Sequence, residues 1–474
     1  MVMVANDGAG GNERDGRWFR GGGETLVMAG VDVQRLIPAT PTSPSRIANA
    51  RCGSIPDTLS SCGYGGVRAY LEDGKSLSNW DAFSLKNPES IVNGDNGFIA
   101  DDHYHQYLKD IEIIESLGVD AYKFSISWAR LLPRGRFGEV NPNGVLFYNK
   151  ILDNLLIKGI KPFVTIYHID FPQELQDRYG SWLSPLMQED YVHHAEMCFK
   201  YFGDRVKHWT TINEPHIVTQ MAYGNGIFPP ARCSQPFGNC SAGNSDIEPL
   251  IVMHNMLLAH GKARDQGGSV GIVVDCLMYE PLTDDDRDQE AFKTGDWLSL
   301  VLDPLIFGDY PSEMRQYLGN QLPRFSNAER KFMANSIDYI AVNHYSTLYV
   351  KDCIHSSCGL TANRAIRGFV DITPERDGVP IGETDGHFNA AGYCESKVQE
   401  VGAQDIQQDV KRIEFHKMYL SSLAQAIRDG ADVRGYFMWT LMDGFEWILG
   451  YNVRFGLYYV DRQTLDRIPK LSAR

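Results

Sequence analysis

Residues 209–215, Trp209-Thr210-Thr211-Ile212-Asn213-Glu214-Pro215, form a β-branched run that ends in an amide, a carboxylate and a proline. Such a run predicts a buried strand, and Pro215 ends it because proline cannot donate a ladder hydrogen bond. Glu214 would then stand at the carboxyl end of a strand. In a (β/α)8 barrel the chemistry lies at these strand ends, so Glu214 is a candidate acid or base. The alternative is a polar pair that caps the following helix.

The rest of the chain alternates between strand-like and helix-like patterns. Between residues 101 and 118, Tyr104, Tyr107, Leu108 and Ile111 follow the i, i+3, i+4, i+7 spacing of an amphipathic helix. Strands separated by helices form parallel βαβ units, and one uninterrupted alternation favours a single closed barrel over two domains. Further helices are predicted at residues 144–158, 186–202, 248–264 and 406–428, and further strands at residues 121–126, 161–170, 270–278, 337–345 and 434–441.

The predicted fold is an α/β (β/α)8 TIM barrel that lacks or distorts its first and seventh strands. Six strands are clear where eight are needed, and the shortfalls lie before Asp101 and between Ile372 and Ile413. A barrel without one strand would leave two unpaired edges. Residues 1–65 are rich in Gly, Ser and Pro without sustained periodicity, so we predict a flexible lead there and one barrel over residues 66–474.

Composition excludes several classes of function. The 474 residues are 43% hydrophobic and 22% charged, which is ordinary globular content. A net charge of -15 would repel nucleic-acid phosphates and anionic membranes, so we expect neither as a partner and favour a neutral or cationic small substrate. No apolar run reaches the length of a membrane span. We expect no cofactor and no metal, and the sequence makes no prediction of the oligomeric state.

The N-terminus and the cysteines point to different compartments. Residues 1–7 lack the basic start and apolar core of a secretory signal, so no signal peptide is visible. Cys233 and Cys240 bracket a short loop, as do Cys353 and Cys358, and both spacings suit small disulfide loops or free surface thiols. No second Cys-x-x-Cys and no His-x3-His accompanies them, which argues against a zinc site.

Polar and aromatic side chains stand at the ends of several predicted strands. His168 ends one, Asn343-His344-Tyr345 ends another, and Trp439 lies at the end of the last. Taken singly, such residues are more often structural, because they satisfy buried hydrogen bonds. In a barrel, however, separate strand ends open into one pocket. A loop after this strand, Asp443-Gly444-Phe445-Glu446-Trp447, adds a carboxylate beside an indole, and this pair suits a hexose. The alternative is a surface turn anchored by a buried Trp, which would have the same sequence pattern.

Several motifs together resemble the family 1 glycoside hydrolases, over most of residues 70–474. The resemblance is to retaining β-glucosidases of the plant type. The motifs that carry it are Asn93-Gly94-Asp95-Asn96, Asp102-His103-Tyr104-His105, Phe124-Ser125-Ile126-Ser127-Trp128, Tyr167-His168, Thr211-Ile212-Asn213-Glu214-Pro215, Gly308-Asp309-Tyr310-Pro311, Asn343-His344-Tyr345, and Trp439 through Phe455-Gly456.

This resemblance implies roles for individual residues. Glu214 would be the acid/base that protonates the leaving group of a β-glucoside. A disulfide would join Cys233 to Cys240, and the protein would be secreted or held in a vacuole or plastid, where the sequon at Asn239 could be glycosylated. The residues implied around the sugar are His168, Asn213, Asn343, Tyr345, Trp439, Glu446, Trp447 and Phe455.

The chain departs from the family where the second catalytic carboxylate should stand. Retaining glycosidases need two carboxyls about 5 to 5.5 Å apart, and the family supplies the nucleophile from a Thr-Glu-Asn-Gly motif ending the seventh strand. That motif is missing. The tract Glu383-Thr384-Asp385-Gly386 only superficially resembles it, because no β-branched strand leads into it, and Ala390 is nearest to the expected position. We identify no nucleophile.

The first strand is disturbed as well. Residues 60–68 replace the family's strand and its glucose-binding Gln, and the match resumes at Tyr70. Ile169 stands where the family usually has Trp. We therefore expect a β-glucosidase-type hydrolase whose turnover is weak or absent. The alternative is a noncatalytic glucoside-binding protein that keeps the sugar-binding residues.

Overall fold

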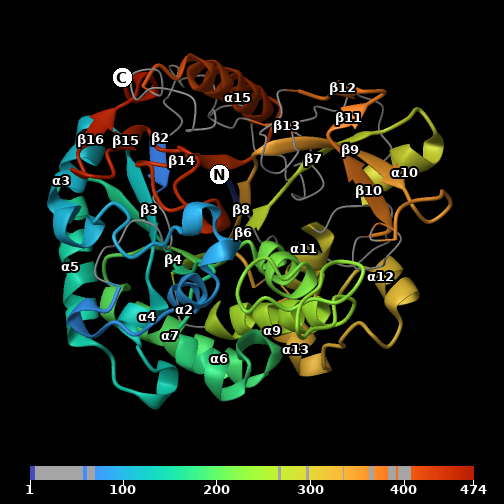
Figure 1. Cartoon of the computed structure of the whole chain (residues 1–474), viewed down its shortest axis with the longest axis horizontal. Coiled ribbons are helices and arrows are strands. Elements are labelled where there is room, and N and C mark those ends of the chain that lie inside the picture. Colours follow the sequence, from blue (N-terminus) through green and yellow to red (C-terminus); the bar gives the residue numbers. More distant parts are fainter. Residues whose placement is uncertain are drawn as a thin grey trace.

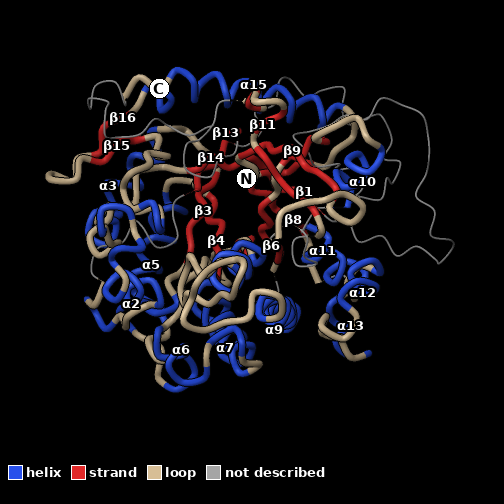
Figure 2. The backbone as a smooth tube through the Cα atoms, turned by 45° about the vertical axis from the view of Figure 1, so that its right-hand side comes forward, coloured by secondary structure: helices blue, strands red, loops and turns tan. Residues whose placement is uncertain are grey.

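The computed structural model describes residues 1–5, 57–60, 70–264, 268–294, 298–334, 336–360, 362, 368–382, 391–392 and 407–474. Within these ranges a barrel of strands is surrounded by helices, as Figures 1 and 2 show. No helix in the described ranges is long and apolar enough to cross a membrane.

Eight strands close the barrel in the order β1-β14-β2-β3-β4-β5-β6-β8. All neighbours in this order pair in parallel except β1, which is antiparallel to both β14 and β8. The predicted closed barrel is thus confirmed. Its strands are β1 (Val2–Ala5), β2 (Asp57–Ser60), β3 (Ala121–Ser125), β4 (Lys161–Tyr167), β5 (His208–Asn213), β6 (Ser269–Asp275), β8 (Tyr339–Asn343) and β14 (Val433–Trp439).

The helices predicted from hydrophobic periodicity are confirmed to within a few residues. In α5, Asn141 caps the first turn with its side chain, Pro142 follows at a position where its missing N–H costs nothing, and Phe147, Ile151 and Leu155 bury one face. The helices are α2 (Asn79–Lys86), α3 (His103–Ser116), α4 (Trp128–Leu131), α5 (Pro142–Ile157), α6 (Gln173–Tyr179), α7 (Leu186–Phe202), α8 (Pro215–Val218), α9 (Glu248–Ala263), α10 (Asp286–Thr294), α11 (Leu298–Phe307), α12 (Ser312–Leu318), α13 (Asn327–Met333) and α15 (Val410–Arg428).

Strand β1 takes the place of the missing seventh strand. Val2 pairs with Val342 on β8 and with Tyr436 on β14, so the two edges that the loss would expose are covered. The Met1 ammonium donates to the Phe437 carbonyl at 2.8 Å, which places the start of β1 at the carboxyl ends of the parallel strands. Figure 1 shows the N-terminus near the middle of the molecule, beside β14 and β8.

Two corrections concern residues 1–65, to which the sequence assigned no structure. This was wrong for β1 and also for β2, which pairs in parallel with β14 and β3 as the first strand of the barrel. Residues 6–56 and 61–69 lie outside the described residues. The division into a lead of residues 1–65 and one barrel over residues 66–474 stays a prediction.

Smaller sheets and two disulfides complete the described structure. Both cysteine pairs, Cys233 with Cys240 and Cys353 with Cys358, form disulfides, so the disulfide interpretation is confirmed over free thiols. The strands outside the barrel are β7 (Met278–Pro281), β9 (Ser346–Asp352), β10 (Val370–Thr373), β11 (Glu375–Arg376), β12 (Val379–Pro380), β13 (Ala391–Gly392), β15 (Tyr458–Val460) and β16 (Arg467–Pro469).

Candidate active site

A pocket of about 470 Å³ opens at the carboxyl ends of the barrel strands. Glu214 follows β5, and Glu446 and Trp447 lie in the loop that follows β14. Every residue that the sequence placed around a sugar lines this pocket. They are His168, Asn213, Glu214, Asn343, Tyr345, Trp439, Glu446, Trp447 and Phe455.

Glu214 does not cap the helix that follows it. Its backbone N–H donates to the Val273 carbonyl of the neighbouring strand at 2.8 Å, but its side chain makes no capping hydrogen bond to α8. The residue has φ 50° and ψ 61°, a left-handed conformation that costs about 1 kcal/mol or more for a non-glycine residue. The carboxyl is instead bound by Asn343, whose Nδ2 donates to Oε1 at 2.5 Å. The capping alternative is therefore wrong.

Three amide and imidazole groups hold one another in place beside Glu214. The Asn213 Oδ1 accepts from the Lys123 ammonium at 3.5 Å and from Asn343 Nδ2 at 3.4 Å. This leaves the Asn213 Nδ2 to donate to His168 Nε2 at 3.2 Å. Burial lowers the pKa of His168 to about 3, so the ring is neutral and accepts at Nε2. The network fixes the orientation of the Asn213, Asn343 and His168 side chains beside Glu214.

Two of the carboxyls that line the pocket, those of Glu214 and Glu446, hold their protons more tightly than free carboxyls do. Burial, and then the negative charge of Asp275, raise the pKa of Glu214 to about 7, although the Asn343 hydrogen bond opposes the rise. Burial and the charge of Glu214 raise the pKa of Glu446 to about 8, against a hydrogen bond from the Trp439 indole. Near neutral pH, Glu214 is thus available both as a proton donor and as a proton acceptor.

Aromatic rings form the walls of the pocket. The centroid of the Trp447 indole lies 5.9 Å from the His168 ring and 4.7 Å from the Trp80 ring, so its position is fixed from two sides. The centroid of the Trp439 indole lies 6.1 Å from that of the His168 ring. Tyr345 is 39% exposed. The arrangement offers flat apolar surfaces next to polar groups, which is how proteins bind hexoses.

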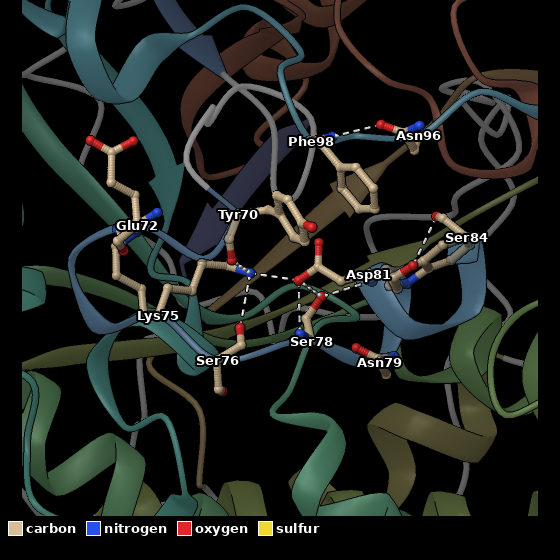
Figure 3. Close-up of polar contacts among 12 residues, drawn as sticks. Tyr70, Glu72, Lys75, Ser76, Ser78, Asn79, Asp81, Ser84, Asn96 and Phe98 are labelled. Atoms are coloured by element: carbon tan, nitrogen blue, oxygen red, sulfur yellow. Dashed lines mark hydrogen bonds and ion pairs between the residues drawn. The ribbon is translucent and has the colours of Figure 1, made fainter. Parts of the chain in front are cut away.

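A clamp from α2 positions the segment that carries His168. The Asn79 side chain donates to the Ile169 carbonyl at 3.2 Å and accepts from the Phe171 N–H at 3.0 Å. The start of α2 is itself held by Lys75, whose ammonium binds the Asp81 carboxylate at 2.5 Å, as Figure 3 shows. Asp81 also accepts from the Ser78 backbone in a capping box. Sequence reasoning missed this clamp, because its members lie about 90 residues apart along the chain.

Two charged residues of the site were also missed. Lys123 is buried inside the barrel on β3, and burial lowers its pKa to about 8 although the charge of Glu214 opposes this. Asp275 ends β6 and lies 3.6 Å from His216 Nε2. Lys123 interrupts the buried strand Ala121–Ser125 and Asp275 ends the apolar strand Ser269–Asp275, and these charged residues in buried strands were the available signal.

The second catalytic carboxylate is not supplied by the described part of the chain. The carboxylates that line the pocket there are Glu214, Asp275 and Glu446. The tract 383–390, with Glu383 and Ala390, lies outside the described residues. Strand β1 stands where the nucleophile strand would be, and neither Met1 nor the strand itself, Val2–Ala5, contains an acidic residue. In the described ranges no cluster of His, Cys, Asp and Glu is arranged to hold a metal.

Curated plant proteins resemble this chain over most of its length. The chain is 46% identical over 459 residues to a protein of Oryza sativa subsp. japonica named "Probable inactive beta-glucosidase 14", covering 88% of this chain and 89% of the relative. It is 44% identical over 448 residues to the coniferin beta-glucosidase of Pinus contorta, covering 86% and 87%.

Solved structures of β-glucosidases share the fold. A rice β-glucosidase superposes with a TM-score of 0.84 at 37% identity, covering 89% of this chain and 96% of that one. The enzyme of the fungus Humicola insolens, determined in complex with glucose, superposes with a TM-score of 0.82 at 31% identity, covering 88% and 95%. The profile described as glycosyl hydrolase family 1 matches residues 60–375 and 388–474. The chain therefore belongs to glycosyl hydrolase family 1.

Proposed function

We propose that this β-glucosidase-type protein binds β-D-glucosides in the pocket around Glu214 and hydrolyses them weakly or not at all. One observation carries the proposal. The sugar-facing residues line a single pocket, whereas the place of the nucleophile strand is taken by β1, which has no acidic residue. Binding and turnover are therefore expected to separate in this chain.

In the proposed complex, Glu214 is the proton donor. With a pKa of about 7 it holds its proton over much of the range in which a glycosidase works, and it can pass that proton to the glycosidic oxygen. His168, Asn213 and Glu446 bind the sugar hydroxyls. Trp447 supplies the flat surface against which the apolar face of the ring stacks. These roles rest on the family resemblance and on the placement of the side chains around one cavity.

Asp275 is poorly placed to replace the nucleophile. Attack must come from the face of the sugar opposite the leaving group, across the pocket from the proton donor. Asp275 ends β6, which pairs directly with β5, so it stands on the same side as Glu214. Its negative charge supports Glu214 as an acid, because it raises the pKa of that carboxyl. Asp275 thus raises the pKa of the proton donor, as the missing nucleophile would, but it cannot form the covalent bond to the sugar.

Activity measurements test the catalytic half of the proposal. Purified protein should release no 4-nitrophenol from 4-nitrophenyl β-D-glucoside above the level of the Glu214→Gln variant. Loss of a nucleophile costs roughly 10⁶-fold in rate in a well-studied hydrolase, so any turnover shared by both proteins is background. Turnover that is abolished by Glu214→Gln and also by Glu383→Gln would overturn the proposal, because it would restore a working pair of carboxyls.

Calorimetry tests the binding half. Glucose and an aryl β-glucoside should each release or absorb heat at millimolar concentration, and the coniferin named for the pine relative is a suitable third ligand. Glu214→Gln should keep this binding, since the amide has the shape of the protonated acid. Binding without turnover favours the second candidate, a noncatalytic glucoside-binding protein. Absence of heat with all three ligands would refute the binding role.

The disulfides support the proposal that the protein is secreted or vacuolar. Cys233–Cys240 and Cys353–Cys358 persist only where thiols are not kept reduced. Asn239, the sequon residue, is exposed beside the first disulfide and is accessible to glycosylation. Mass spectrometry of protein purified from its native tissue should find both disulfides and a glycan on Asn239. Four free thiols at the disulfide positions would contradict the proposed location.

A further inference from the structure

Strands β8 and β14 extend beyond β1 at the carboxyl end of the barrel. The last pairs that β1 makes at this end join Val2 to Val342 and Tyr436, and the Phe437 N–H donates to the Met1 carbonyl. Asn343 on β8 and Trp439 on β14 lie past these pairs. Among the residues that the structure describes, the wall of the barrel is therefore incomplete between these two strand ends.

The pocket continues through this opening toward α15. Beyond the sugar-facing residues it is lined by aromatic side chains from two elements, and we call this part the α15 compartment. The Tyr419 ring lies 5.9 Å from the Tyr436 ring and 5.5 Å from the Phe415 ring. The described residues that line it are His344, Leu348, Phe415, His416, Tyr419 and Tyr436. Aromatic rings that are tilted against one another around a cavity offer a site for another flat apolar group.

His344 brings an unpaired polar group to this compartment. Both of its ring nitrogens are buried and make no hydrogen bond within the described part of the chain. Its ring lies 5.6 Å from the Tyr419 ring, so it faces the aromatic cluster. Burial lowers the pKa of His344 to about 4, and the ring is neutral, with one N–H donor and one acceptor nitrogen. Buried polar groups in proteins are nearly always paired, so a ligand hydroxyl is the missing partner that fits.

The charges near the compartment favour an uncharged ligand. Arg412 also lines the pocket, but its guanidinium already donates to the Trp439 carbonyl at 3.0 Å and to the Gly456 carbonyl at 2.7 Å. The negative charge of Asp275 acts on His344 and would repel an anion there. The Met1 amino group also acts on His344 and lines the same pocket, but burial lowers its pKa to about 5, so it carries little positive charge at neutral pH. The other polar group next to the rings is neutral as well, because the pKa of His416 falls to about 3 on burial and its Nδ1 lies 2.9 Å from the Tyr436 hydroxyl.

We propose that the α15 compartment binds a small uncharged phenol or aromatic alcohol, with its ring among Phe415, Tyr419 and Tyr436 and its hydroxyl on His344. This ligand is not the leaving group of a bound glucoside. The compartment lies between β8 and β14, on the side of the absent nucleophile, whereas the leaving group must lie on the side of Glu214. The site is therefore a second one, and it does not depend on the proposed glucoside binding.

Calorimetry with 4-methylphenol, toluene and benzoate tests the proposal on the intact protein. We expect 4-methylphenol to bind with 1:1 stoichiometry, and toluene, which has the same shape without the hydroxyl, to bind about tenfold more weakly. An excess of glucose should leave the affinity for 4-methylphenol unchanged. Equal affinity for toluene, tighter binding of benzoate, displacement by glucose, or no heat at millimolar 4-methylphenol would each overturn the proposal.

A pair of histidine variants locates the hydroxyl partner. His344→Leu should remove the preference for 4-methylphenol over toluene, while glucose binding stays as in the unchanged protein. His355→Leu is the matched control, because His355 lies on an exposed loop away from the pocket, and it should keep the tenfold preference. If His344→Leu does not fold, the comparison of 4-methylphenol with toluene on the unchanged protein still decides the question. A preference that survives in a folded His344→Leu variant would refute the assignment.

Discussion

Replacing Glu214 by Gln should stabilise the folded protein at pH 8 much more than at pH 5. The folded protein holds the Glu214 proton up to a pKa of about 7, whereas the unfolded chain releases it near the ordinary glutamate value of 4.5. Between these two pH values the folded state binds more protons, so the free energy of unfolding falls as pH rises through this window. Because Gln does not titrate, the free energy of unfolding of the variant does not fall with pH in this way.

The magnitude follows from the difference between the two pKa values. A difference of about 2.5 units, from 4.5 to about 7, corresponds to about 3 kcal/mol at pH 8, since each unit is worth about 1.4 kcal/mol. At pH 5 the loss of stability is only about 1 kcal/mol, because pH 5 lies just above the unfolded pKa and well below the folded one. The Gln Oε1 can still accept from Asn343 Nδ2, so the main hydrogen bond of the carboxyl is kept.

Urea unfolding of both proteins at pH 5 and pH 8, followed by tryptophan fluorescence, measures the effect. The gain in the free energy of unfolding from Glu214→Gln should be about 2 kcal/mol larger at pH 8 than at pH 5. Glu89→Gln is the control, because Glu89 is exposed, and it should change stability by less than about 0.5 kcal/mol at either pH. A gain that is equal at the two pH values, or larger at pH 5, would refute the conclusion that burial and the charge of Asp275 raise the pKa of Glu214.

Three further predictions concern the same part of the molecule. Asp275→Asn should lower the pKa of Glu214 by about one unit, because it removes a like charge. In the Asp275→Asn background, the stability gain from Glu214→Gln should then differ less between pH 5 and pH 8. An unchanged difference would contradict the charge coupling. Trp447→Ala should weaken glucose binding about tenfold in calorimetry, while Leu146→Ala on the exposed face of α5 should not; equal affinities would remove Trp447 from the sugar site. Met3→Pro should cost about 3 kcal/mol or more in the free energy of unfolding, since β1 pairs on both sides, and a thermal melt within a degree or two of the unchanged protein would show that β1 does not close the barrel.

Most of the barrel could be predicted because its strands and helices are long and locally periodic. The strand predicted from residues 209–215 is observed as His208–Asn213, and the helix expected at residues 186–202 is observed as Leu186–Phe202. Strand β1 could not be found this way. It has four residues, too few for a periodic signal, and its partners lie more than 300 residues away along the chain. Only the geometry of the open edges reveals that such a short apolar segment fits there.

The candidate site was predictable to the extent that strand ends converge. Residues such as His168 and Asn343 come from distant parts of the chain, yet His168 directly follows one barrel strand and Asn343 ends another, and that alone brings them together. Lys123 was not predicted to belong to the site, because a lysine in a strand is expected to face solvent unless a buried partner is known. The partner is Asn213, 90 residues away. The electrostatics of a site thus depend on contacts that local patterns do not contain.

The fold and the activity of this chain place different demands on the seventh position of the barrel. Closing the barrel requires backbone hydrogen bonds, which Met1–Ala5 can supply to β8 and β14 in the antiparallel direction. Catalysis requires one carboxylate about 5 to 5.5 Å from Glu214, and that distance is set by a parallel strand ending at the pocket. An antiparallel strand presents its first residue there instead of its last. A point mutation to Glu within β1 should therefore not restore turnover, whereas replacing the tract 383–390 with a parallel strand that ends in Glu should, and hydrolysis of 4-nitrophenyl β-D-glucoside by each variant distinguishes the two.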